Sequence, residues 1–150
     1  MRALLGILIA VGLLGAGQRV AAQRSAGRLG VGPQVGTPSG LSLKVYLPGH
    51  RALSVATTSD FDDYVEVHAY HAWERPLPQS PFWSFAGVGV ITGGRRDPGR
   101  DPVLLSVGAL AGINFFAERF EVFLQMTPAF RILPHREPRL TGSAGLRYYF

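Results

Sequence analysis

The sequence contains no cysteine and few charged residues. Without cysteine among its 150 residues the chain forms no disulfide, which excludes a fold held together by a disulfide framework. Charged residues make up 17% of the chain, below the roughly 25% that is usual in soluble domains. The basic residues are scattered, whereas a nucleic-acid-binding protein gathers them in a stripe. We therefore expect no nucleic-acid partner.

Outside the N-terminus the sequence has no long apolar run. The run from Ala3 to Ala16 is shorter than the about 20 residues that span a bilayer as a helix, which argues against an uncleaved anchor. It is followed by Val20-Ala21-Ala22, a small-x-small cleavage site. We expect a signal peptide over residues 1–22, a short polar lead-in over residues 23–28, and a mature chain of 150 − 22 = 128 residues.

What the chain does have is short runs of alternating apolar and polar residues. Its 19 glycines and 11 prolines fall between or within these runs, a distribution typical of an all-β chain. The alternation predicts eight strands, at Leu29–Val35, Gly40–Leu47, Ala52–Thr58, Tyr64–Trp73, Phe82–Ile91, Val103–Phe115, Arg119–Phe130 and Arg139–Phe150.

Alternation alone fits both a water-facing sandwich and a membrane barrel. Two features favour the barrel: the polar faces mix small polar residues with single charges, and aromatic residues gather near the strand ends, where membrane interfaces would lie. In hydrocarbon, a sheet must pair its first strand with its last, because unpaired backbone groups cost several kcal/mol each. We expect an eight-stranded antiparallel up-and-down transmembrane β-barrel over residues 29–150, in the outer membrane, with its lumen filled by side chains.

The links between the predicted strands alternate in length. Thr92–Pro102 and Ile132–Pro138 are long and polar, and an even strand count with periplasmic termini places both on the cell surface. The Pro-rich link Glu74–Pro81 is the exception, because it is long yet falls on the periplasmic side.

Four segments resemble small, poorly characterised outer-membrane proteins of Gram-negative bacteria: GVGPQVGTPSGLSLKVYL (Gly30–Leu47), GVGV (Gly87–Val90), EVFLQMTPAF (Glu121–Phe130) and GSAGLRYYF (Gly142–Phe150). The resemblance implies an eight-stranded outer-membrane barrel without an established activity.

Motifs of known chemistry are not found. The sequence contains no nucleophile elbow, zinc-protease motif or phosphate loop. His68 and His71 are three residues apart, so a strand would point them to opposite faces and prevent a shared metal site. The glycines of Gly30-Val31-Gly32 and Gly87-Val88-Gly89 are interpreted as lumen-facing positions that make room for bulky residues opposite them. We expect no catalytic, cofactor-binding or metal-binding residues, and therefore no enzyme.

Four charged residues fall on predicted inward faces: Lys44, Glu66, Glu121 and Arg147. An unpaired charge in the lumen would be costly, so we expect a lumen charge network, with Glu121 and Arg147 as a cross-strand pair. Its expected role is to stiffen the barrel, and a ligand or ion site is the less favoured alternative.

The C-terminal strand ends with apolar residues at alternate positions, among them Leu146, Tyr148 and Phe150. These residues are expected to form the signal that the barrel-assembly machinery reads. The expected partners are this machinery and outer-membrane lipid, with the protein itself a monomer.

Two other functions remain open at the level of sequence. A soluble periplasmic or secreted barrel that binds a small apolar ligand would turn the apolar faces inward. A lipid A-modifying barrel enzyme is less favoured, because no catalytic set is recognised. The favoured function is a structural or surface-interaction role in the outer membrane.

Overall fold

The structure, a computed structural model, describes residues 27–37, 39–59, 64–95 and 103–150. The expected signal peptide, its cleavage site after Ala22 and residues 23–26 lie outside the described residues, as do residues 96–102 of the expected surface link. These parts of the sequence analysis stay predictions.

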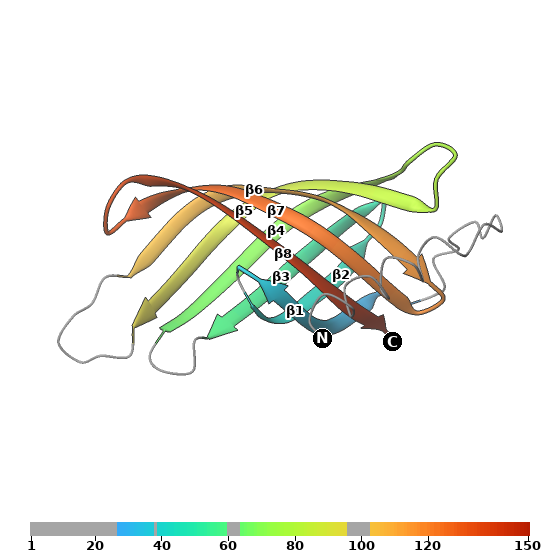
Figure 1. Ribbon diagram of the computed structural model, residues 1–150, viewed down its shortest axis with the longest axis horizontal. Helices are drawn as coiled ribbons and strands as arrows, with labels where there is room; N and C mark the ends of the chain where they lie inside the picture. Colours follow the sequence, from blue (N-terminus) through green and yellow to red (C-terminus); the bar gives the residue numbers. More distant parts are fainter. Residues whose placement is uncertain (1–26, 38, 60–63, 96–102) are drawn as a thin grey trace, which may run out of the picture.

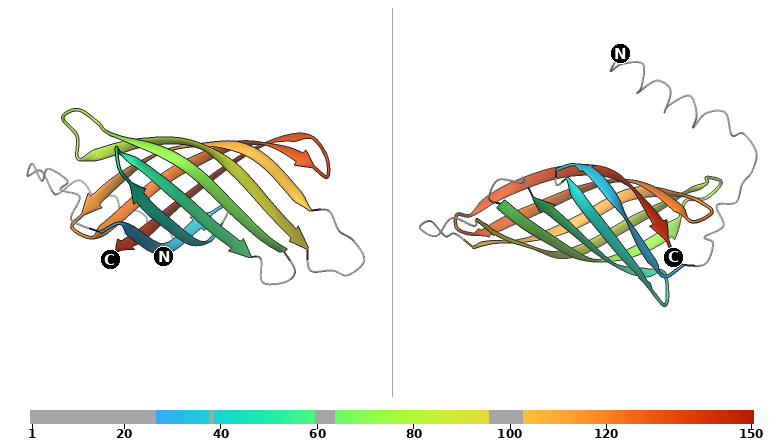
Figure 2. Two further views of the ribbon diagram at one scale, coloured as in Figure 1. Left: turned by 180° about the vertical axis from the view of Figure 1, so that it is seen from behind. Right: turned by 90° about the horizontal axis from the view of Figure 1, so that it is seen from below.

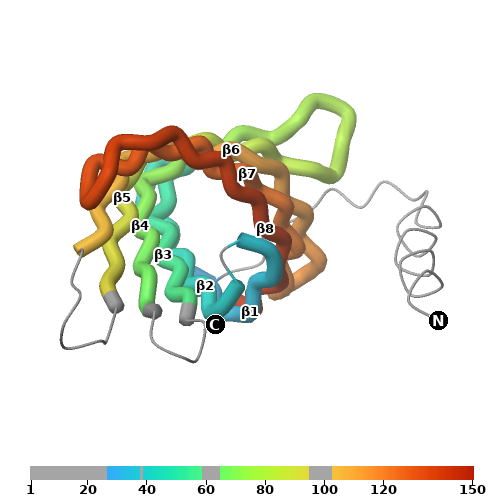
Figure 3. The backbone as a smooth tube through the Cα atoms, turned by 60° about the vertical axis from the view of Figure 1, so that its left-hand side comes forward, coloured from blue at the N-terminus to red at the C-terminus, as the bar shows by residue number. Residues whose placement is uncertain are grey.

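Within the described residues the chain forms eight strands that close into one barrel (Figure 1). The strands are β1 (Leu29–Gly36), β2 (Gly40–Leu47), β3 (Arg51–Ser59), β4 (Tyr64–Pro76), β5 (Phe82–Arg95), β6 (Leu104–Ala117), β7 (Phe120–Leu133) and β8 (Glu137–Tyr149). Each strand pairs antiparallel with the next, and β1 pairs with β8 to complete the ring seen in Figure 3. The predicted all-β, eight-stranded antiparallel barrel is confirmed. None of the described residues forms a helix long and apolar enough to cross a membrane.

The wall of the barrel is higher on one side than on the other (Figures 1 and 2). β1 and β2 have 8 residues each, whereas β5, β6 and β7 have 14 each. We call the end where β1 begins and β8 finishes the termini end, and the opposite end the loop end. At the termini end β1, β2 and β8 are level, since Gly30 pairs with both Lys44 and Tyr149. β4 and β5 extend further there, because β4 continues to Pro76, beyond Trp73, which pairs with Arg51 at the start of β3. At the loop end β1 stops at Gly36, opposite Ser143, so both ends contribute to the difference in height.

Several strands extend into segments that the sequence assigns to links. β4 continues to Pro76, so the expectation that Glu74 lies in a link is wrong. β5 continues through Gly93 and Gly94, and β7 and β8 take up most of the expected link Ile132–Pro138. The physical reason is pairing: Gly93 and Gly94 lie opposite Glu66 and Val65 of β4, and this ladder outweighs the weak strand propensity of glycine.

Glycines of the lumen lie directly opposite aromatic rings. Gly30 pairs with Tyr149, Gly89 with Tyr70, Gly112 with Phe85 and Gly145 with Phe123. In each pair, a Cβ added to the glycine would come within 2.5 to 2.6 Å of an atom of the facing ring. The rings therefore lie flat over positions that lack a side chain, an arrangement that also shields the glycine backbone. This matches the interpretation given to Gly30 and Gly89 from the sequence.

Candidate functional site: a charged lumen and an apolar wall

Side chains of the barrel alternate between a polar lumen and an apolar outer wall. The buried polar and charged residues are those that point inward: Gln34, Ser42, Lys44, Ser54, Glu66, His68, Glu74, Ser106, Asn114, Glu121, Gln125, Thr127, Ser143 and Arg147. All four charged residues predicted to face the lumen are among them. Burial of this kind is tolerated only where the charges meet partners.

A group of four charged side chains fills the lumen near the termini end, and we call it the termini-end network: Lys44, Glu74, Glu121 and Arg147. The Lys44 ammonium forms ion pairs with Glu74 and with Glu121, the latter at 2.7 Å from Nζ to Oε1. Arg147 lies directly opposite Glu121 on the neighbouring strand and donates to its Oε2 at 3.1 Å. Since two carboxylates meet two cations, the network carries no net formal charge.

Neutral polar groups complete this network. Asn114 Nδ2 donates to Glu74 Oε1 at 3.2 Å and to Glu121 Oε1 at 2.7 Å. The hydroxyls of Tyr46 and Tyr149 donate to Glu74 and Glu121, respectively. Such bonds satisfy carboxylate lone pairs that the cations do not reach, which is what a buried ion pair needs to be stable.

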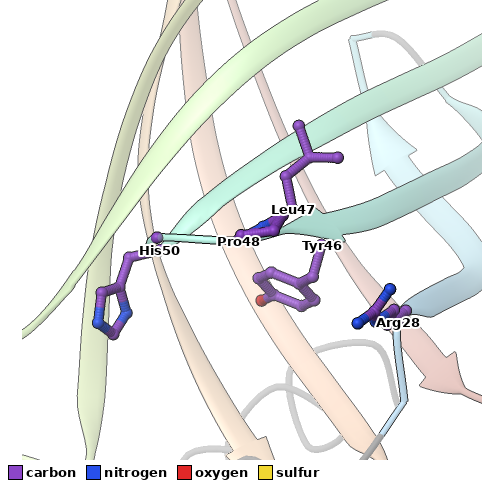
Figure 4. Close-up of a pocket in the computed structure, with 6 residues that line it drawn as sticks. Arg28, Tyr46, Leu47, Pro48 and His50 are labelled. Atoms are coloured by element: carbon purple, nitrogen blue, oxygen red, sulfur yellow. The ribbon is translucent and has the colours of Figure 1, made fainter.

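Aromatic rings cover the network on the side of the termini. Tyr46, Phe116 and Tyr149 pack against one another, and Trp83 meets Phe116 edge to face at 6.4 Å between centroids. Outside this layer lies an open pocket of about 370 Å³, lined by Arg28, Tyr46, Leu47, Pro48, Gly49 and His50 (Figure 4). The termini end of the lumen is therefore closed by packed rings beneath a shallow, basic mouth.

Glu66 does not join the termini-end network. It accepts a bond from Arg139 NH1 at 2.8 Å, and His68 Nε2 lies 3.6 Å from its Oε1. We call Glu66, His68 and Arg139 the loop-end cluster. On β4 it is separated from Glu74 by Tyr70 and Ala72, which belong to the apolar cluster inside the barrel. The single lumen network expected from the sequence is thus two separate groups.

Sequence reasoning missed Glu74 and Arg139 as members of these groups. Glu74 continues the inward alternation of Glu66, His68, Tyr70 and Ala72, and this signal was available but was overruled by the nearby prolines. Arg139 reaches across the lumen from β8 to β4, strands that are not neighbours in the sheet. No pattern along one strand indicates such a contact.

The two histidines of β4 point to opposite faces, as predicted. His68 is buried in the lumen, while His71 packs beside Trp73 on the outer wall, 4.6 Å between ring centroids. Among the described residues, no group of three or more histidine, cysteine or acidic side chains could hold a metal ion.

The outer wall is apolar along its height. Large side chains with more than two fifths of their area exposed include Leu53, Val88, Leu124, Met126 and Leu140. Aromatic residues gather on the outside of the termini end, where ring contacts join Phe82 to Phe115 and Phe120 to Tyr148. A water-soluble protein rarely exposes so continuous an apolar surface.

The residues of the expected assembly signal lie on this outer wall. Leu146 is 41% exposed and Phe150 is 67% exposed, with the Phe150 ring edge-on to Tyr148. Phe150 donates its backbone N–H to Leu29 O. Recognition of these residues by an assembly machinery stays a prediction.

Two solved structures share this architecture. The N-terminal β-barrel domain of Pseudomonas aeruginosa OprF matches with a TM-score of 0.58 and 11% identity, over 81% of this chain and 95% of that chain. Neisserial surface protein A (NspA) matches with a TM-score of 0.51 and 14% identity, over 81% of this chain and 93% of that chain. No protein-family model and no curated sequence matches the chain. At these identities the likeness concerns the fold: the chain is a closed eight-stranded barrel of the same architecture.

Proposed function

We propose that this protein is an integral outer-membrane β-barrel with a structural or surface-interaction role. The observation that carries the proposal is the inverted distribution of polarity. Charged side chains such as Lys44 and Glu121 lie at 2% and 0% exposure inside the barrel, while Leu124 and Leu140 are 58% and 70% exposed on its wall. Hydrocarbon is the solvent that favours this arrangement.

The alternative of a soluble barrel around a small apolar ligand requires the opposite orientation of the faces. Its lumen would be apolar and its wall polar. Here the wall is apolar and the termini end of the lumen holds paired charges, while the centre of the lumen is filled by the packed side chains of Phe85, Leu110 and Phe123. The likeness to a barrel described as a surface protein also supports a location in the membrane.

The proposed orientation places the termini end in the periplasm and the loop end at the cell surface. In this orientation the aromatic residues outside the termini end lie at the inner interface of the outer membrane, a position that such rings favour. The proposed partners are membrane lipid along the wall and the assembly machinery during insertion.

Fractionation of cells that produce the full chain tests this proposal. We expect the protein in the sarkosyl-insoluble membrane fraction, with migration on a gel that changes on heating because the closed barrel resists the detergent. Release by osmotic shock, without a heat-dependent shift, would contradict membrane integration. Loss of a lipid A modification on deletion of the gene would instead identify an enzyme.

A further inference from the structure

A hollow of about 390 Å³ lies on the outer wall near the termini end. It is lined by Trp73, Arg75, Ser84, Phe85 and Ala86. Trp73 pairs with Ala86 and Arg75 pairs with Ser84, so large side chains of β4 stand beside small ones of β5. This difference in side-chain size forms the hollow. The basic residue Arg75 lies at the end of the hollow nearest the termini end.

A second arginine flanks the same hollow. Arg51 begins β3 directly opposite Trp73, which makes it the diagonal neighbour of Arg75. Diagonal positions on one face of a sheet lie about 7–8 Å apart, within joint reach of long side chains. Both arginines are exposed, and within the described parts of the chain neither forms an ion pair; the Arg51 Nε donates to Pro48 O at 3.0 Å. Arg75 therefore lines the hollow, and Arg51 extends from the diagonal position beside it, with its Nε at the β2–β3 turn.

The neighbouring strands carry a second, mostly apolar hollow. Ala86 pairs with Ala111 of β6, and Ala111 lines this second hollow of about 460 Å³ with Ile113, Leu124, Met126 and Gly142. Met126 and Gly142 lie near the middle of β7 and β8. We call the two hollows together the path. It leads from Arg75, near the aromatic residues outside the termini end, toward the middle of the wall.

We infer that this path is a binding site for one anionic glycerophospholipid. Its phosphate lies between Arg51 and Arg75, its glycerol region beside Trp73, and an acyl chain along Ala86 and Ala111. Arginine suits this ligand because its planar donors match phosphate oxygens. A headgroup with a full negative charge, as in phosphatidylglycerol, is favoured over a zwitterionic one, because no acidic side chain of the described residues is paired with either arginine. The inference rests on the proposed membrane location.

Trp73 provides the test, since the chain has two tryptophans and the other, Trp83, faces the lumen mouth. The Trp83→Phe variant, inserted into phosphatidylcholine vesicles, is titrated with phosphatidylglycerol or phosphatidylcholine carrying bromine on the acyl chains. Bromine quenches only a ring that it touches. We expect phosphatidylglycerol to associate with Trp73 about threefold or more in excess of phosphatidylcholine, in line with the attraction of basic residues for anionic lipid.

Removal of both arginines (Arg51→Gln with Arg75→Gln) in the same background should bring this ratio to about one. The control is Arg119→Gln, which removes one positive charge from the β6–β7 turn, away from the path, and should leave the ratio unchanged. Ala86→Leu, which keeps both arginines, should reduce quenching by filling the path of the acyl chain.

The outcomes separate this inference from the proposed function. Equal quenching by the two lipids before any arginine is changed, or a preference that survives in the double variant, would overturn the phosphate site. Undiminished quenching in Ala86→Leu would overturn the acyl path. A Trp73 that neither lipid quenches, with emission typical of water, would overturn membrane insertion itself.

Discussion

The two ends of the lumen solve the problem of buried charge in different ways. At the termini end, Lys44, Glu74, Glu121 and Arg147 neutralise one another, and three aromatic rings cover them. At the loop end, Glu66 depends on Arg139, whose side chain is 24% exposed, and the buried His68 Nε2 has no hydrogen-bond partner. The termini-end network pairs all four of its charged groups within the barrel, although Asn114 Oδ1 also has no hydrogen-bond partner, whereas the loop-end cluster depends on a cation that water can reach. The comparison therefore assigns stability to the termini end and adaptability to the loop end.

Removal of the Glu121 carboxylate should have the largest effect. Glu121→Ala leaves Lys44 and Arg147 without their shared acceptor, and loss of one partner from a buried ion pair costs about 3–5 kcal/mol. Urea unfolding in lipid vesicles measures this loss. Arg147→Leu in the same chain should restore part of the stability, because it removes an uncompensated charge. Strictly additive losses would show that the two residues do not depend on each other.

An arginine introduced on the outer wall should destabilise the barrel somewhat less than removal of a charged group from the termini-end network. Leu124 is 58% exposed near the middle of β7. The substitution Leu124→Arg should destabilise the inserted barrel by about 2–4 kcal/mol. Phe120→Arg, on the same face at the start of β7, serves as the depth control and should cost about 1 kcal/mol or less. Equal costs measured by unfolding in vesicles would contradict the assigned position of the membrane.

A methyl group at Gly30 should disturb the cover of the termini end. A Cβ there would lie 2.5 Å from Tyr149 Cζ, so the ring must move and release Glu121. Overpacking of this kind costs about 1–3 kcal/mol. Gly94→Ala at the loop end is the matched control, because no atom lies within 4 Å of its Cβ position, and its effect should stay within about 0.5 kcal/mol. Similar melting shifts for the two variants would remove the contrast between the ends.

Neutralisation of Glu66 should have the smallest effect of the four. Glu66→Gln weakens the bond from Arg139, and we expect a loss of about 1–2 kcal/mol because water can solvate the partly exposed guanidinium. The same substitution at Glu121 is the control and should cost more. If Glu66→Gln proved the more damaging of the two in urea unfolding, the loop end rather than the termini end would be the stabilising region.

Much of this fold follows from local alternation. The period of two along each strand predicts which residues face inward, and adjacency of β7 and β8 predicts that Glu121 meets Arg147. The ends of the strands are harder to predict from the sequence. The low strand propensity of Gly93 and Pro76 indicates a link, whereas the neighbouring strand pairs with both residues and extends the sheet. Contacts across the lumen are hardest. The meeting of Arg139 with Glu66 depends on how closure of the sheet aligns β8 with β4, and no local pattern contains that alignment.

The unequal height of the wall has a consequence for how the barrel meets its surroundings. The pairing of β1 with β8 ends at Gly36, opposite Ser143. Toward the loop end, no described strand flanks β8 on that side, so Glu137–Thr141 forms a free strand edge. Such edges invite pairing with another chain. Here Pro138 has no N–H to offer, and the charged Glu137 and Arg139 flank it. These are devices by which natural sheets discourage edge-to-edge aggregation, so the taller side of the wall can project into water without adding a ninth strand from a neighbour.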